Sequence, residues 1–123
     1  MNLVDSSAWL EYFAGTNEGK KFRAAIESTS TLIVPTIVLF EVFKKMLLEL
    51  GERAALRTTG HMMKAAVIPL DEKLSLDAAG ISVKYKFAMA DSIILATAQR
   101  SRATIWTQDA DFKGLPGVKY FKK

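Results

Sequence analysis

The chain of 123 residues carries 17 basic and 13 acidic side chains, a net charge of +4, and half of its residues are hydrophobic. Its length suits one domain that buries a core without disulfides, and the lack of cysteine excludes both disulfides and thiolate metal sites. No apolar run approaches the roughly 20 residues that cross a bilayer, so we expect a single cytoplasmic domain over residues 1–123 with no membrane segment.

Short apolar stretches alternate with helical patterns along the whole chain. In chain order, the patterns predict a strand at 1–4, helices at 6–13 and 17–27, a strand at 31–34, a helical hairpin of 36–50 and 52–63, a strand at 66–68, helices at 71–84 and 88–100, and strands at 104–106 and 118–121. Ser6 or Ser7 is expected to cap the first helix. Strands that alternate with helices favour right-handed parallel crossovers. We therefore predict an α/β fold, a three-layer α/β/α sandwich around a central parallel five-stranded sheet.

Four acidic residues stand at unusual places in this pattern. Asp5 directly follows the first apolar strand, and Asp109 follows the fourth. Glu41 is the only charge in the helical stretch TIVLFEVF, and Asp91 is the only charge in FAMADSIILATAQ. Because burying an unpaired carboxylate is costly, acids in such apolar surroundings need an explanation.

Taken one by one, these acids have ordinary structural explanations. Asp5 and Asp91 suit helix N-caps, and Asp109 suits an Asx turn. Glu41 can pair with a neighbouring lysine. Taken together they fit a site, because ligands of parallel sheets bind beyond the carboxyl ends of the strands. If the first strand is central, all four acids meet at that edge.

Clustered carboxylates repel one another and need positive charge to coexist. No cluster of His or Cys accompanies them, and an all-oxygen site selects hard cations such as Mg²⁺ or Mn²⁺. We predict a metal site formed by Asp5, Asp91 and Asp109. Because Mg²⁺ is commonly shared between carboxylates and substrate phosphate, the expected substrate is a phosphate ester. Ser6 and Thr107 either support the carboxylates or a metal-bound water, or are ordinary turn residues.

The charge balance points the same way. If the four acids share one site, 9 of the 13 acidic side chains remain to offset 17 basic ones, and such a surface suits a polyanion. The basic residues come in small clusters, each of which alone is typical of a solvated helix face. These clusters are Lys20-Lys21-Arg23, Lys44-Lys45, Arg100-Arg102 and Lys122-Lys123.

The four acids lie in motifs that resemble a known family. Asp5 follows the first strand, Glu41 ends the motif PTIVLFE, Asp91 lies in MADSIILATA and Asp109 lies in TQDADF. In this order and spacing, the motifs resemble those of PIN-domain ribonucleases, and most closely the VapC toxins of type II toxin-antitoxin systems. The resemblance covers the whole chain.

The resemblance implies a PIN-like fold with metal-dependent endoribonuclease activity, in which a metal-activated water attacks an RNA phosphodiester. It implies Asp5, Glu41, Asp91 and Asp109 as the catalytic acids. Asp111 would be either a fifth member or a hydrogen-bond partner within its loop. The resemblance also implies a homodimer and a cognate VapB-like antitoxin that inhibits by covering the site.

Other functions are compatible with parts of the pattern. One is a PIN-like RNA-processing nuclease outside any toxin-antitoxin pair. Another is a magnesium-dependent phosphoacceptor domain, but that class usually has paired acids after the first strand, and here Ser6-Ser7 follow Asp5. A third is a module that holds RNA without cutting it, to which the four acids would contribute nothing.

The predicted hairpin at 36–63 carries more apolar residues than one side of a small sheet can cover. Part of this surface belongs to the core. We expect the rest to be exposed and to receive an apolar segment of the antitoxin, which would place an arginine among the carboxylates. Glu41 lies on the same predicted helix, so a segment bound there can reach the acids.

Overall fold

A single parallel sheet forms the centre of the molecule in the computed structural model, which describes residues 1–123. Its strands are β1 (Asn2–Val4), β2 (Leu32–Pro35), β3 (Ala66–Ile68), β4 (Thr104–Thr107) and β5 (Val118–Tyr120). They lie in the order β3-β2-β1-β4-β5, and every neighbouring pair is parallel. Leu3 of β1 pairs with Ile33 on one side and with Ile105 on the other. The predicted central, parallel, five-stranded sheet is confirmed.

Helices cover both faces of this sheet. They are α1 (Ser6–Ala14), α2 (Asn17–Lys20), α3 (Arg23–Glu27), α4 (Thr36–Leu50), α5 (Glu52–Met62), α6 (Glu72–Tyr85) and α7 (Met89–Ser101), with short 3-10 turns η1 (Thr29–Thr31) and η2 (Ala110–Phe112). The connections from β1 to β2 and from β2 to β3 cross the sheet in one direction, whereas the connection from β3 to β4 returns. Right-handed crossovers therefore put the two sets of helices on opposite faces.

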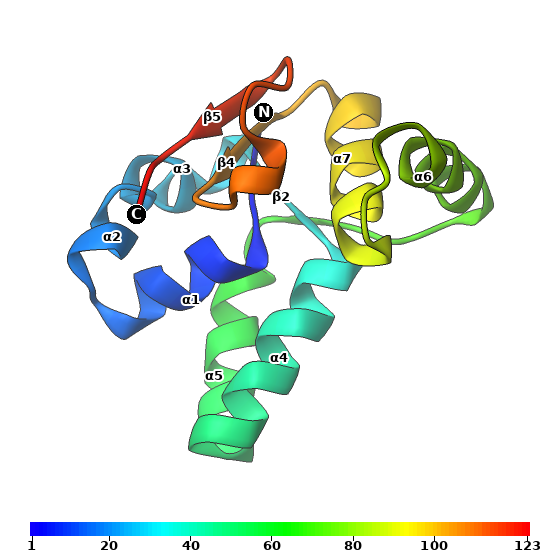
Figure 1. The fold of residues 1–123 in the computed structure, drawn as a ribbon. Coiled ribbons are helices and arrows are strands. Elements are labelled where there is room, and N and C mark those ends of the chain that lie inside the picture. Colours follow the sequence, from blue (N-terminus) through cyan, green and yellow to red (C-terminus); the bar gives the residue numbers. More distant parts are fainter.

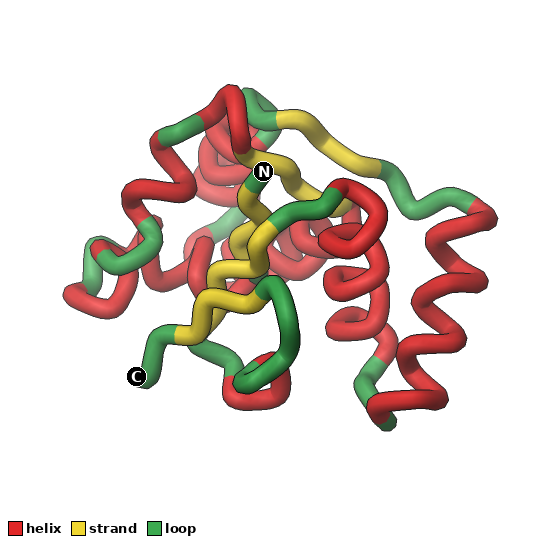
Figure 2. Tube along the Cα trace, turned by 90° about the horizontal axis from the view of Figure 1, so that it is seen from above, coloured by secondary structure: helices red, strands yellow, loops and turns green.

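The pictures show this layering plainly. In Figure 1, α6 and α7 lie on one side of the strands and α1 to α3 lie on the other. The hairpin of α4 and α5 extends past the sheet on the side where β2 ends. Figure 2, seen from above, shows the strands between the two groups of helices. The predicted three-layer α/β/α sandwich is thus confirmed.

Two local predictions differ from the structure. The single helix expected at 17–27 is divided into α2 and α3, because the chain turns at Lys21 and Phe22 to bury the Phe22 ring completely. The first helix is capped by Asp5, whose side chain accepts from the Ala8 amide, and not by Ser6 or Ser7. A carboxylate at the end of β1 is already in the extended conformation that an N-cap needs.

The hairpin divides its apolar residues between the core and the surface. Val38 and Val42 of α4 are fully buried in the main core. Other large apolar side chains of the hairpin are exposed, namely Phe40, Leu47, Leu48, Leu50, Leu56 and Met63. The hairpin is therefore only partly a core element, as its composition indicates. No helix of the structure has the length and apolar character needed to cross a membrane.

Candidate active site

Asp5 occupies the carboxyl end of the central strand and is almost completely buried, with 4% of its surface exposed. One carboxylate oxygen, Oδ1, accepts hydrogen bonds from the Ala8 amide at 3.0 Å and from the Ser7 hydroxyl at 3.4 Å. The other oxygen, Oδ2, accepts from the hydroxyl of Thr107. Both oxygens of this carboxylate are therefore engaged by neighbouring groups of the chain.

Thr107 links this carboxylate to the loop that follows β4. Its side chain is fully buried, and its hydroxyl accepts a hydrogen bond from the Asp109 amide at 2.8 Å. The same hydroxyl donates its proton to Asp5, so one small side chain satisfies a backbone donor and a buried carboxylate. Thr107 thereby fixes the end of β4 to the end of β1, and it sets the start of the loop that carries Asp109.

Glu41 lies on α4, one and a half turns after the end of β2, and is half-buried. Its Oε1 atom accepts a hydrogen bond from the Ser6 hydroxyl at the start of α1. The neighbouring lysine Lys45 instead pairs with Glu49, so Glu41 has no lysine partner in this structure. The hydroxyl bond ties α4 to the residue directly after Asp5, and it directs Glu41 towards the end of the central strand.

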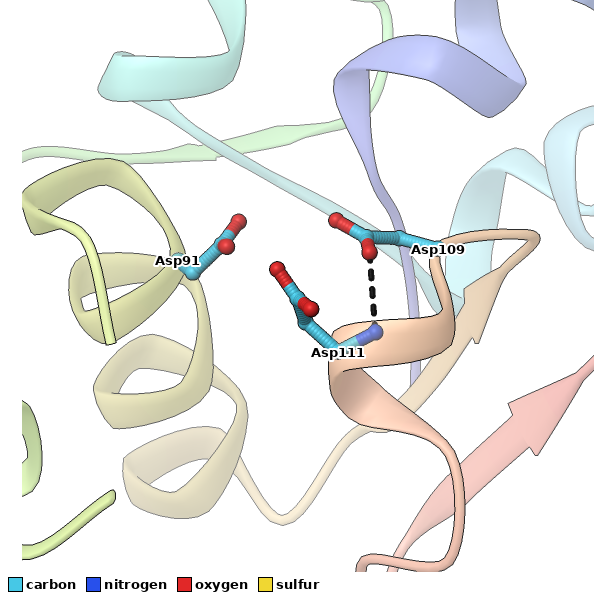
Figure 3. A group of neighbouring side chains, drawn as sticks. All are labelled: Asp91, Asp109 and Asp111. Atoms are coloured by element: carbon cyan, nitrogen blue, oxygen red, sulfur yellow. Dashed lines mark hydrogen bonds between the residues drawn. The ribbon is translucent and has the colours of Figure 1, made fainter. Parts of the chain in front are cut away.

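Three further carboxylates meet opposite these two. Asp91 comes from the first turn of α7, and Asp109 and Asp111 come from the loop and the η2 turn after β4. One oxygen of each lies within 4.8 Å of the others, and Figure 3 shows the three side chains pointing towards one another. Asp109 Oδ1 also accepts from the Asp111 amide at 2.9 Å, which is the Asx turn expected of Asp109 taken alone. The structural and the functional explanations of Asp109 therefore hold together.

Burial and like charge raise the pKa of two of these carboxyls. Burial is the main cause for Asp5, where repulsion from Asp109 adds to it and the Thr107 hydrogen bond opposes it. Burial also leads for Asp91, and the nearby charges of Asp109 and Asp111 help to raise its pKa to about 6. The other two acids make smaller contributions of the same sign. The whole cluster therefore shares one electrostatic field that disfavours full ionisation.

The structure places every acid singled out in the sequence at the carboxyl edge of the sheet, but in two groups. Asp91, Asp109 and Asp111 bring their oxygens together, whereas Asp5 is bonded to Thr107 and Glu41 is bonded to Ser6. Ser6 contacts Glu41 and not Asp5. The sequence reasoning missed Ser7 as a donor to Asp5. It also left the role of Asp111 undecided. Asp109 begins an Asx turn in which it accepts a hydrogen bond from the Asp111 amide, and this turn brings the two acids side by side.

The donor set fits a hard divalent cation. The converging atoms are all carboxylate oxygens, which suit Mg²⁺ or Mn²⁺ and do not suit softer metals. Figure 3 marks no hydrogen bond between Asp91 and the other two acids. A cation between these side chains would offset the repulsion that raises the pKa of Asp91.

Comparison with known proteins settles the family. Residues 3–118 match the family model of the PIN domain. The chain belongs to the PIN-domain family. Comparison with curated protein sequences gave no match. That the whole chain forms one PIN domain over residues 1–123 remains a prediction.

Solved structures of toxins share this PIN fold. A chain of a toxin-antitoxin complex from Klebsiella pneumoniae is 26% identical, with 100% of both chains covered and a TM-score of 0.85. A VapC toxin from Mycobacterium tuberculosis, which cleaves the sarcin-ricin loop, is 18% identical, with 96% of this chain and 97% of that one covered and a TM-score of 0.79. DNA-bound VapBC from Salmonella typhimurium is 16% identical, with 99% and 98% covered and a TM-score of 0.74. These likenesses show that the chain has the same PIN fold as the VapC proteins.

The raised pKa of Asp91 predicts a pH-dependent effect of the Asp91→Asn substitution. An aspartate titrates near 3.9 when unfolded, whereas the pKa of Asp91 is about 6 in the folded PIN domain. The folded state holds the proton more tightly, so stability is lost as pH rises from about 4 to about 6 and stays lost above. Discounted for solvent screening, the loss is on the order of 1 kcal/mol. In metal-free buffer, Asp91→Asn should match the wild type at pH 4 and exceed it by about that amount at pH 7.

Urea unfolding at several pH values, with a chelator present, measures this difference directly. The matched control is Asp77→Asn, which changes an exposed aspartate of α6 that pairs with Lys73. A stability gap between Asp91→Asn and the wild type that does not change with pH would contradict the assignment of repulsion to this site.

Proposed function

We propose that this PIN domain is a metal-dependent endoribonuclease that cleaves RNA phosphodiester bonds, and that it is the toxin of a toxin-antitoxin pair. The observation that carries the proposal is the convergence of Asp91, Asp109 and Asp111 beside the buried Asp5, in a chain of the PIN-domain family. Acids that raise one another's pKa weaken the fold, so a cost of this kind is best explained by function.

The acids have different tasks in this proposal. Asp91 and Asp109 hold Mg²⁺ or Mn²⁺, and Asp111 is close enough to share it. Asp5 is held at the end of β1 by hydrogen bonds from Thr107 and from the start of α1, and its predicted part in binding the metal remains a prediction. Glu41 reaches the site from α4, where it is held by the Ser6 hydroxyl, and completes the catalytic set. When bound, the cation would activate a water and stabilise charge that develops on the phosphate.

The hydrogen bonds of Asp5 argue against the phosphoacceptor alternative. Such a domain phosphorylates a carboxylate oxygen, which has to be free to attack the donor. In this structure Asp5 Oδ1 accepts from Ala8 and Ser7, Oδ2 accepts from Thr107, and only 4% of the residue is exposed. An oxygen held in this way orients its neighbours and is poorly placed to act as a nucleophile.

Neutralising a single acid should abolish cleavage without unfolding the protein. We expect Asp91→Asn to lower the rate of magnesium-dependent RNA cleavage at least about 100-fold. The substitution removes the carboxylate charge that would hold the cation, and the cation would stabilise the transition state. Glu41→Gln should act similarly. The measurement is a gel of RNA incubated with and without Mg²⁺, beside circular dichroism spectra.

Asp77→Asn again serves as the control, because this carboxylate lies outside the site and is exposed. Cleavage that survives in both Asp91→Asn and Glu41→Gln would assign the activity to another site. Which RNA is cut, and where, can be identified by sequencing RNA ends after induced expression of the wild type in cells, with Asp5→Asn as the control.

Metal binding should be visible as stabilisation. A cation that binds only the folded state stabilises it by about 2.7 kcal/mol at a hundredfold excess over Kd. Millimolar Mn²⁺ should therefore raise the melting temperature of the wild type, and should raise that of Asp91→Asn less. Equal shifts in the two proteins would place the ion elsewhere.

The partner in this proposal is a VapB-like antitoxin. One solved relative is a chain of a toxin-antitoxin complex from Klebsiella pneumoniae, and another is DNA-bound VapBC from Salmonella typhimurium. The PIN domain has an apolar groove of about 570 Å³ on the α4–α5 hairpin, lined by Leu39, Phe40, Phe43, Lys44, Leu47, Leu56, Thr59 and Met63. Because Glu41 lies on the same helix, an apolar segment in this groove could deliver an arginine to the carboxylates.

The homodimer that the resemblance implies remains a prediction. Leu76, Val83 and Met89 on α6 and α7 are highly exposed and lie apart from the hairpin groove. We expect the second copy to pack against exposed apolar residues of these two helices.

A charge in the hairpin groove should release the toxin from inhibition. Leu47 lines the groove and is 44% exposed, so Leu47→Glu should leave the fold and RNA cleavage nearly intact while weakening inhibition by the co-expressed antitoxin. The matched control is Leu48→Glu, which changes the next residue of α4, exposed but outside the groove. Growth of cells that express both proteins is the readout. Full inhibition of the Leu47→Glu protein would show that the antitoxin binds elsewhere.

A further inference from the structure

Two lysine clusters that lie at opposite ends of the sequence meet in the folded chain. Lys20 and Lys21 are in and just after α2, and Lys122 and Lys123 follow β5. The Lys21 ammonium donates a hydrogen bond to the Lys122 carbonyl at 3.2 Å, across 101 positions of sequence. Figure 1 shows the C-terminus beside α2. Clusters that look separate in the sequence therefore form one basic region.

A fifth lysine extends this region along the edge strand. Lys119 of β5 pairs in register with Trp106 of β4, and its ammonium lies 4.1 Å from the centre of the indole ring. Phe121 stacks on the same indole, with 5.7 Å between ring centres. The two rings hold the lysine by a cation–π contact while its side chain stays exposed. We call the surface formed by Lys20, Lys21, Lys119, Lys122 and Lys123 the tail surface.

None of these lysines is neutralised by an acid. The molecule has four salt bridges, and their basic partners are Arg23, Lys45, Lys73 and Arg100. The chain after Asp111 contains four lysines and no aspartate or glutamate. The tail surface therefore concentrates positive charge that the protein itself does not use.

Thr107 contacts both the segment that carries the tail lysines and the acid cluster. The Phe121 amide donates to the Thr107 carbonyl at 2.8 Å, and the Thr107 side chain holds Asp5. Because β4 and β5 are parallel, their carboxyl ends share one edge of the sheet. Lys122 and Lys123 come one residue after the end of β5, so they leave the sheet at the edge that carries the carboxylates.

A simpler explanation covers only part of this pattern. Lysines on an edge strand prevent the strand from pairing with another chain, and β5 is an edge strand. That explains Lys119. It does not explain why α2 brings two more unpaired lysines to the end of the strand.

We propose that the tail surface binds the phosphate backbone of the RNA substrate on one side of the bond that is cut. The inference rests on the proposed nuclease function and names the surface that would hold the substrate. Lysine ammonium groups bind phosphates as point charges and carry little sequence information, so this contact positions the RNA and does not select its sequence. The Trp106 and Phe121 rings position Lys119 and need no contact with the RNA.

The test measures binding separately from cleavage. A labelled single-stranded RNA is titrated by fluorescence anisotropy in a salt series against the Asp91→Asn protein, which binds without cutting. Adding Lys119→Gln and Lys122→Gln should weaken binding on the order of tenfold at low salt, and should make the salt dependence shallower by about 1.4 in log–log slope, about 0.7 for each lost phosphate contact. In the cleaving protein, the same pair should raise KM far more than it lowers kcat.

Two further variants make the result specific. Lys73→Gln with Lys84→Gln removes the same charge from α6, away from the tail surface, and should leave binding nearly unchanged. Lys20→Gln with Lys21→Gln removes two charges from the α2 part of the tail surface. This pair should weaken RNA binding to a similar extent, and it tests the surface even if the substitution at Lys119 disturbs the fold. Melting temperatures show which variants are folded.

Each remaining outcome overturns the inference. If the tail variants bind RNA as tightly as their parent, the RNA follows another path, and the nuclease proposal stands without this surface. If the α6 control loses as much affinity, only net charge matters. If the tail variants bind RNA normally but escape the antitoxin, the surface contacts protein. If the unsubstituted protein neither binds nor cuts RNA, the proposed function fails as well.

Discussion

The site depends on one hydroxyl, that of Thr107, which accepts from the Asp109 amide and donates to Asp5. A carboxylate with 4% exposure at the end of the central strand would be very costly without donors. The Ala8 amide and the Thr107 hydroxyl supply them, and they come from the two elements that must meet there, α1 and β4. The same bonds that make burial of Asp5 tolerable therefore align the strand ends on which the other acids are mounted.

The remaining carboxylates are held together against their own repulsion. Asp91 feels the charge of Asp109 and Asp111, and its pKa of about 6 records both that repulsion and its burial. The side chains cannot relax apart freely, because α7 packs against β4 and Asp109 is bonded to the Asp111 amide. Rigid elements thus maintain an arrangement that the charges oppose, which is what a preorganised cation site requires.

The acids of this site could be predicted from the sequence where they interrupt an apolar stretch. An acid inside an apolar helical stretch, such as Glu41 or Asp91, is visible without a structure, and alternating strands and helices set the edge at which such acids gather. The partners were harder to predict, because they depend on side-chain direction. Ser6 turned to Glu41 and not to Asp5, and the burial of Phe22 divided one expected helix into two. Contacts across 101 positions, such as that of Lys21, leave no trace in local sequence.

The order of the strands gives the two proposed partners separate approaches to the same acids. The helix with the apolar groove follows β2, on one side of the central strand, whereas the tail surface lies around β5, beyond β4 on the other side. An antitoxin segment in the hairpin groove and an RNA strand on the tail surface would therefore overlap only at the carboxylates between them. To compete there, a positively charged side chain of the antitoxin would have to bind the carboxylates. It would then take the place of the metal ion that otherwise links them to the RNA phosphate. In the proposed complex, inhibition would thus be an electrostatic substitution at the acid cluster, and the apolar groove would hold the segment that carries the substituting charge.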